Sequence, residues 1–207
     1  MQVELKDFCA KAIKIFNEAI EDYHIENNID AEPNNNYEFK TIEYYLYQKC
    51  WIDTIQWHME DFMRDPDIDP EEALLMKRKI DRSNQDRTDL VELIDSYFLQ
   101  HFAGVTPQPN ATINTESPAW AIDRLSILQL KIYHMHVEVD RKDTSDEQVS
   151  SVKAKMAVLE EQNRDLAKAI DTLLEDIAMG RKYMKVYKQM KMYNDPNLNP
   201  ILYGKER

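Results

Sequence analysis

The sequence predicts an all-α protein: long antiparallel helices packed as an up-and-down bundle, then a short basic C-terminal helix and an irregular tail. Apolar residues recur at alternating steps of three and four over long stretches, which is the spacing of a helix face. Only HMHVEVD, residues 134–140, alternates as a strand would, and it fits a fraying helix end equally well. The 207 residues include three glycines, each placed after a periodic segment, where a helix end favours glycine.

The first three helices have clear boundaries in the sequence. The first is expected over about 2–28 and ends before DAEPNNNY. The second is expected over about 37–64 and ends at RDPDIDP. An aspartate, a proline and a glutamate within 69–72 then form a capping box with proline at the first helical position. This signal predicts a third helix of about thirty residues that ends near Gly104.

A long loop separates this helix from the fourth. The segment 104–116, GVTPQPNATINTE, is long for a loop of a compact domain, which favours a functional role. Ser117, followed by proline, caps the fourth helix, which is expected to fade near Val139. Ser145 opens a fifth helix that continues to about Met179.

The domain organisation follows from these elements. We expect one all-helical domain over 1–207, with an N-terminal helix in 1–28 and a four-helix core in 37–179. The remainder, 180–207, is expected to hold the basic helix and the tail NDPNLNPILYGKER.

Composition excludes several classes of function. A formal net charge of −12 argues against nucleic-acid binding, because phosphate backbones attract basic surfaces. Three glycines cannot form a P-loop or a dinucleotide fingerprint, so any bound phosphate must be held by side chains. No apolar run approaches the length of a transmembrane helix, the start is not a secretory signal, and the two cysteines form no CxxC. We therefore expect a cytoplasmic protein without a transmembrane segment.

A basic run near the C-terminus is the local exception to the acidic composition. It has two interpretations. It is either a C-terminal helix whose cations favour its own carboxyl end and are solvated on one face, or a segment that docks on an acidic surface of this protein, of a protein partner or of a second copy in a homodimer. Its residues are Arg181, Lys182, Lys185, Lys188 and Lys191, interleaved with Tyr183, Tyr187, Met190 and Tyr193.

The second, third and fifth helices show the seven-residue spacing of bundles packed near +20°, and helices two to five are expected to pack around one seam. Their expected core seam consists of Trp51, Ile55, Val91, Ile94, Leu125, Leu128, Leu159, Leu166 and Leu173. The same seam also carries polar residues, and an unpaired buried charge costs several kcal/mol, so these residues need an explanation. They include Gln48, His58, Asn84, Arg87 and Asn163, together with Asp123, Arg124, Ser126 and Lys131 of the stretch ESPAWAIDRLSILQLKIY.

An antiparallel arrangement would bring these polar residues together. A turn near residue 67 sets Gln48 level with Arg87, and a turn near residue 142 sets Asn163 level with Asp123. Lys131 would then fall near Arg87. The expected result is one or two polar layers inside the bundle.

The chain also resembles an uncharacterised bacterial family, domain of unknown function 4254. Four strings carry the resemblance: QKCWIDTIQWHMED, KIDRSNQDRTDLVELID, NTESPAWAIDRLSILQLKIYHM and YKQMKMYNDPNLNPILY. The resemblance implies an all-helical cytoplasmic protein of bacteria such as Bacteroidota, often encoded near glycosyltransferases for cell-surface glycan synthesis. It implies no activity and no catalytic residue.

Known helical metal sites are matched only in part. The all-α pyrophosphatase and ferritin-like patterns each lack half of their ligands, and a helix-surface histidine beside an acid is common without a metal. His58 lies on an apolar stripe, as a core histidine does. No metal site and no cofactor are predicted. The partial matches are Glu92 and Asp95 with His58 and Asp61, Glu21 with His24, His134 with Glu138, and His136 with Asp140.

Two functional hypotheses remain, and whether the protein is an enzyme stays open. In the first, Arg87, Arg124 and Lys131 bind an anionic small molecule such as phosphate, a sugar phosphate or a nucleotide sugar. Four polar residues would orient these cations or a sugar hydroxyl: Asp123, Asn84, Asp86 and Asn163. In the alternative, the same groups pair internally as a structural network in a helical scaffold or protein-interaction module. The first is preferred narrowly, because three clustered cations lack evident compensation and because the family resemblance implies a glycan-related setting.

Overall fold

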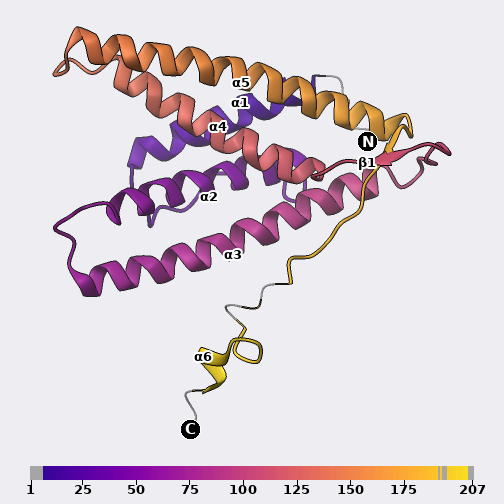
Figure 1. The fold of residues 1–207 in the computed structure, drawn as a ribbon, viewed down its shortest axis with the longest axis horizontal. Coiled ribbons are helices and arrows are strands. Elements are labelled where there is room, and N and C mark those ends of the chain that lie inside the picture. Colours follow the sequence, from indigo (N-terminus) through magenta and orange to yellow (C-terminus); the bar gives the residue numbers. More distant parts are fainter. Residues whose placement is uncertain (1–6, 191, 193–194, 205–207) are drawn as a thin grey trace.

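The computed structural model of the protein describes residues 7–190, 192 and 195–204. It confirms the predicted all-α class (Figure 1). The elements are α1 (Phe8–Glu26), α2 (Ile42–Phe62), α3 (Pro70–His101), β1 (Thr112–Ile113), α4 (Pro118–Val139), α5 (Asp146–Ala178), β2 (Lys182–Tyr183) and α6 (Pro200–Tyr203).

Two helical hairpins form the body of the molecule. α2 and α3 make one hairpin and α4 and α5 make the other, and Figure 1 shows each pair side by side. α1 packs against α2, α4 and α5, so it joins the two hairpins.

One hydrophobic core runs through all five long helices. α1, which lies within the expected N-terminal helix of residues 1–28, contributes Phe16, Ala19 and Ile20 to this core with no exposed surface. These residues follow the three-and-four spacing of one helix face, which explains why α1 can be covered by neighbours on several sides.

Side-chain caps fix most helix starts where the sequence predicts them. Asp69 accepts hydrogen bonds from the backbone at the start of α3, and Ser117 and Ser145 do the same for α4 and α5. The second helix begins at Ile42 and not at residue 37, because Lys40 has a positive φ of 70° that no helix continues through.

The predicted seam is buried for the most part. Trp51, Val91, Ile94, Leu125, Leu128 and Leu173 are buried, while Ile55, Leu159 and Leu166 are partly buried. The buried face of α2 also contains Lys49 and Asp53, two charged residues that the seven-residue spacing did not place there.

The predicted basic helix is wrong for the described residues. Residues 181–190 form strand β2 and extended chain, while Lys191 and Tyr193 lie outside the described residues. The physical reason lies at Gly180, whose φ of 69° ends α5 and turns the chain toward β1. β1 and β2 then pair in parallel, with Thr112 opposite Lys182 and Ile113 opposite Tyr183.

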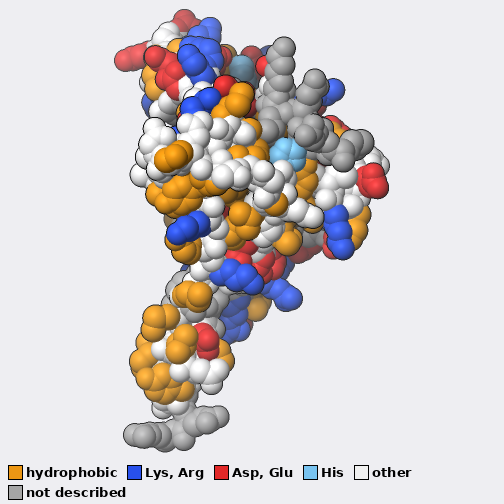
Figure 2. Space-filling view, turned by 90° about the vertical axis from the view of Figure 1, so that its right-hand side faces the viewer, with side chains coloured by type: hydrophobic (Ala, Val, Ile, Leu, Met, Phe, Trp, Pro, Cys, Tyr) orange, Lys and Arg blue, Asp and Glu red, His pale blue; other side chains and the backbone are white. Residues whose placement is uncertain are grey.

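The segment that includes α6 extends from the helical body, at the lower end of Figures 1 and 2. Hydrophobic side chains gather on it in Figure 2, and they are exposed: Leu198, Ile201, Leu202 and Tyr203.

Among the described residues, no helix combines the length and the apolar character that a membrane crossing requires.

Candidate functional site

A network of buried charges joins α2, α3 and α4. The Nζ of Lys49 lies 3.0 Å from the Oδ1 of Asp123 and also forms an ion pair with Asp53. The guanidinium of Arg87 donates from Nε to Oδ1 of Asp123 at 2.9 Å and from Nη2 to Oδ2 at 2.8 Å. The hydroxyl of Ser126 donates to Asp53 at 2.6 Å. Two cations and two carboxylates therefore balance one another inside the bundle.

The two carboxylates of this network differ in their pKa. Burial raises the pKa of Asp53 above its ordinary value, although Lys49 opposes the shift. Burial would raise the pKa of Asp123 too, but the charge of Lys49 and the hydrogen bond from Arg87 outweigh burial and lower it. Asp123 is therefore ionised at neutral pH, and its two cationic partners offset the cost of burying it.

A pocket of about 410 Å³ opens beside this network, between α2, α3 and α4. Three acids and two arginines are among its lining residues: Asp53, Glu60, Asp61, Arg64 and Arg87. Arg64 lies within 4.0 Å of carboxylate oxygens of both Glu60 and Asp61. The surplus of acids makes this pocket a poor site for an anion.

The structure does not bring the three predicted cations together. Arg87 lies in the buried network, while Arg124 is exposed and its Nη1 lies 3.0 Å from Oε1 of Glu116. Lys131 is also exposed, and it lines a groove between α4 and α5 that Arg124 shares. Arg87 and Lys131 line different pockets, so the pocket linings do not place Lys131 beside Arg87 as predicted.

The remaining predicted residues lie in three different places. Asn84 accepts a hydrogen bond from Gln56 at 2.8 Å, on the α2–α3 side of the bundle. Asn163 accepts one from Gln129 at 2.7 Å, between α4 and α5. Asp86 is exposed and lines a separate groove that α2 and α3 share.

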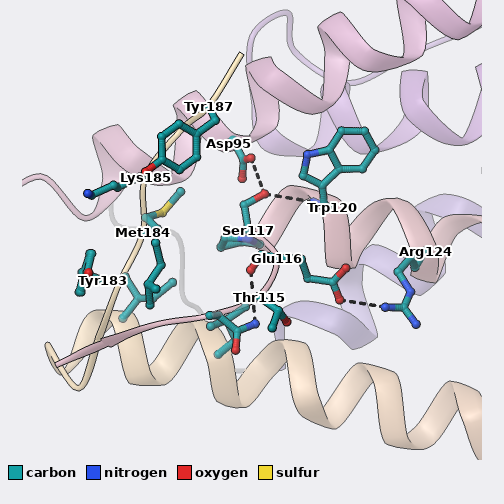
Figure 3. A pocket seen from close by; sticks show the side chains of 15 residues that line it. Asp95, Thr115, Glu116, Ser117, Trp120, Arg124, Tyr183, Met184, Lys185 and Tyr187 are labelled. Carbon is teal, nitrogen blue, oxygen red and sulfur yellow. Dashed lines mark hydrogen bonds and ion pairs between the residues drawn. The ribbon is translucent and has the colours of Figure 1, made fainter. Parts of the chain in front are cut away.

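A second pocket, of about 380 Å³, lies at the amino-terminal end of α4 (Figure 3), and we call it the α4 pocket. The loop before α4, the first turns of α4, the end of α5 and the segment after β2 form its walls. Three aromatic side chains line it: Trp120, Tyr183 and Tyr187. Arg124 and Lys185 bring cations, and in Figure 3 they lie on opposite sides of the view.

Gly180 holds two walls of the α4 pocket in place. Its amide donates to the carbonyl of Ile177 at 3.0 Å, and the next amide donates to that of Asp176 at 2.8 Å, which is a Schellman motif. A Cβ at Gly180 would stand 2.7 Å from the carbonyl oxygen of Thr106. The long loop can therefore approach the end of α5 only because this residue has no side chain. The amide of Gln108 also donates to the carbonyl of Gly180 at 2.9 Å.

A buried aspartate that lines the pocket fixes the start of α4. Asp95 on α3 accepts hydrogen bonds from Ser117 Oγ at 2.5 Å and from the amide of Ala119 at 3.0 Å. Burial raises the pKa of Asp95, and these two bonds oppose the shift. The segment after β2 is tied to the same helix, since the amide of Gln189 donates to Glu92 at 2.9 Å. α3 therefore positions both sides of the pocket.

The α4 pocket combines three kinds of interaction. Aromatic rings can stack on a planar ring or cover the apolar face of a sugar. Arg124 and Lys185 can attract an anionic group. Glu116, Thr115 and Asn114 offer oxygen atoms to hydroxyl groups, although Glu116 currently accepts from Arg124. A ligand that is both anionic and rich in hydroxyl groups would use all three kinds of interaction.

Sequence reasoning identified parts of this pocket without assembling them. The sequence indicates Arg124, the long loop and the aromatic-basic run separately, and it predicts a helix for the run. Trp120 was missed. The signal that could have found the pocket is the pairing of the loop with the chain after Gly180, which is a contact between distant segments.

Three histidines form a third cluster, between α1, α2 and α4. His24, His58 and His134 each bring a ring nitrogen to within 4.8 Å of the others. Burial, with the neighbouring His24 charge second, lowers the pKa of His58. Burial and then the charges of His58 and His24 bring the pKa of His134 to about 4. In the part of the chain that the structure describes, this is the one group of three or more residues placed to hold a metal ion.

Comparison with known proteins gives one match. Residues 43–186 match the model of a family described as protein of unknown function (DUF4254). No curated protein and no solved structure matches the chain.

Proposed function

We propose that this chain, which belongs to the DUF4254 family, binds a small anionic molecule such as a sugar phosphate or a nucleotide sugar in the α4 pocket. The family description names no function, so the proposal rests on the pocket itself. A ligand of this class fits a role accessory to cell-surface glycan synthesis, which the sequence resemblance implies.

One observation carries the proposal. Aromatic and cationic side chains from two distant segments line one pocket, whose volume of about 380 Å³ suits a small molecule. Trp120 and Arg124 come from α4, while Tyr183 and Lys185 come from β2 and the chain after it. Inorganic phosphate alone would not need the aromatic walls, so a ligand with a ring or a sugar fits better.

Arg124 is the cation from the sequence hypothesis that this pocket retains. Its side chain is 63% exposed and paired only with the half-buried Glu116 among the described residues. Such a surface pair contributes at most about 1 kcal/mol, so an incoming phosphate can displace the carboxylate at little cost. Glu116 would then be released to accept a hydrogen bond from a hydroxyl of the ligand.

A thermal-shift titration with UDP-glucose, glucose 1-phosphate and inorganic phosphate tests the proposal. UDP-glucose or glucose 1-phosphate should raise the Tm of the wild type with concentration, as mass action requires. Arg124→Met should fold normally and lose this response. Arg141→Met is the matched control, because Arg141 also pairs with carboxylates at the surface but does not line the pocket.

A helical scaffold is the second candidate, and the buried network favours it. Lys49, Asp53, Asp123 and Arg87 satisfy one another within the chain, as the alternative hypothesis expects of a structural network. A wild-type Tm that does not respond to any of the three ligands would reject ligand binding in the α4 pocket and leave the scaffold.

A further inference from the structure

The histidine cluster has the geometry of a metal site. The Nε2 atoms of His24 and His58 lie 3.3 Å apart. Two nitrogen ligands at about 2.0–2.1 Å from a tetrahedral zinc ion stand about 3.3 Å from each other. The third ring nitrogen, from His134, lies within 4.8 Å of both. A small side-chain movement would therefore complete three corners of a tetrahedron.

The backbone orients the first of these ligands. The Nδ1 of His24 lies 2.6 Å from the carbonyl oxygen of Ile20, so this nitrogen carries the hydrogen. Its Nε2 is then an unprotonated acceptor that points at His58. A hydrogen bond from the far ring nitrogen to a carbonyl is the usual support of a metal-ligating histidine.

The third ligand has an unused atom. The Nε2 of His134 is buried and has no hydrogen-bond partner among the described residues. A buried polar atom without a partner costs free energy, and such an atom needs an explanation. A metal ion bound by this nitrogen would supply the missing partner.

Aromatic side chains hold the three rings in place. Trp57 stacks on His134 at 4.7 Å between ring centroids, and Tyr23 stacks on His58 at 5.1 Å. Tyr133 packs on His24 at 4.4 Å. These contacts restrict the ring orientations, which lowers the cost of arranging the ligands on binding.

The cluster also has a route to solvent. Each of the three histidines keeps part of its surface exposed. Trp57 lines the α2–α4 pocket of about 410 Å³ as well as contacting His134, and Asp61 lines the same pocket. The charge of Asp61 acts on His134, so this carboxylate favours a cation electrostatically without being one of the three ligands.

We propose that His24, His58 and His134 bind one divalent transition-metal ion, with Zn²⁺ as the expected occupant and water at the fourth position. Imidazole ligands suit zinc and its neighbours, whereas Mg²⁺ and Ca²⁺ require oxygen ligands. Three protein ligands with an open fourth position are typical of zinc sites that bind a further molecule. This site is separate from the α4 pocket, so either proposal can fail without the other.

Cobalt is a suitable probe, because four-coordinate Co²⁺ absorbs visible light far more strongly than aqueous Co²⁺. The full chain, freed of metal with a chelator, is titrated with Co²⁺ at neutral pH, and Zn²⁺ is then added as a competitor. The wild type should bind one Co²⁺ per chain with the intense spectrum, and Zn²⁺ should displace it. Absence of this spectrum in the wild type at excess Co²⁺ would overturn the proposal.

Two variants on one helix localise the site. His134→Gln should weaken binding by more than about 100-fold, since even outer-shell partners of a metal site contribute about 10–100-fold. His136→Gln is the matched control, because His136 is exposed on the same helix and is not part of the cluster. Equal loss in both variants, or full binding by His134→Gln, would contradict the assignment. If circular dichroism shows that His134→Gln is unfolded, His24→Gln and His58→Gln replace it with the same expected loss.

Discussion

Lys49 on α2 and Asp123 on α4 form an ion pair of 3.0 Å whose two side chains are 0% and 5% exposed. This pair explains why the apolar helix α4 carries a charge at its buried face. Lys49 from α2 and Arg87 from α3 both pair with this carboxylate, so the network fixes the relative positions of three helices. A buried network of this kind is costly to break from one side, which makes it the first target for mutation.

Lys49→Met should destabilise the protein by about 3–5 kcal/mol, because it leaves Asp53 and Asp123 buried near each other with Arg87 as their remaining cation. Lys77→Met makes the same chemical change in an exposed pair with Asp81 and should cost no more than about 1 kcal/mol. Urea unfolding monitored by circular dichroism measures both. Similar losses in the two variants would show that burial does not govern the contribution of the pair.

Gly180→Ala should destabilise the protein by at least about 1–2 kcal/mol, because an L-residue is strained at its φ of 69°. The close carbonyl of Thr106 adds a steric cost and should displace the loop that lines the α4 pocket. Gly104→Ala is the control, since a Cβ there meets no atom within 4 Å, and it should be neutral or stabilise by up to about 1 kcal/mol. The urea midpoint of Gly180→Ala should therefore fall, whereas that of Gly104→Ala should stay unchanged or rise.

Ser117→Ala should cost more than Ser145→Ala, although both serines cap long helices. Ser145 only accepts a hydrogen bond from Gln148, and loss of such a cap costs about 0.5–2 kcal/mol. Ser117 accepts from Trp120 and also donates to the buried Asp95, so its loss removes a partner of that carboxylate. We expect about 1–3 kcal/mol beyond the cap, measured as the difference between the two unfolding free energies. Equal costs would mean that Asp95 does not depend on Ser117.

Tyr37 should make the protein sensitive to alkali. Burial and the hydrogen bond to Glu18 raise the pKa of Tyr37 from 10.0 to about 12. A raised folded-state pKa gives stability that is present below the unfolded pKa and lost as the pH rises from about 10 to about 12. Tyr37→Phe should therefore lose less stability than the wild type across this window. Tyr187→Phe, at a side chain 71% exposed, should follow the wild type in the same stability-against-pH series.

The helices could be predicted from the sequence because their signals are local. The caps Asp69, Ser117 and Ser145 act within one turn, and the apolar spacing identifies the buried face of each helix. The start of α2 was missed because the positive φ of Lys40 has no side-chain signature.

The contacts between helices could be predicted only in outline. The expected antiparallel alignment set Gln48 level with Arg87, but the structure pairs Arg87 with Asp53 and Asp123. Asn163 meets Gln129 and not Asp123. The apolar spacing indicates which face of a helix is buried, but a single sequence does not show which neighbouring helix each residue of that face meets. The histidine cluster could not be predicted for the same reason, because its members come from three helices.

The position of α1 has a consequence for synthesis on the ribosome. The amide of Cys9 donates to Asp171 at 3.0 Å, and these residues are 162 positions apart. At about 5–20 residues per second, roughly 8–30 s separate the translation of the two. During that interval α2 can already cover one side of α1, but its faces toward α4 and α5 stay open. The nascent chain must therefore keep an apolar helix surface from aggregating until α5, which carries Asp171, has been made.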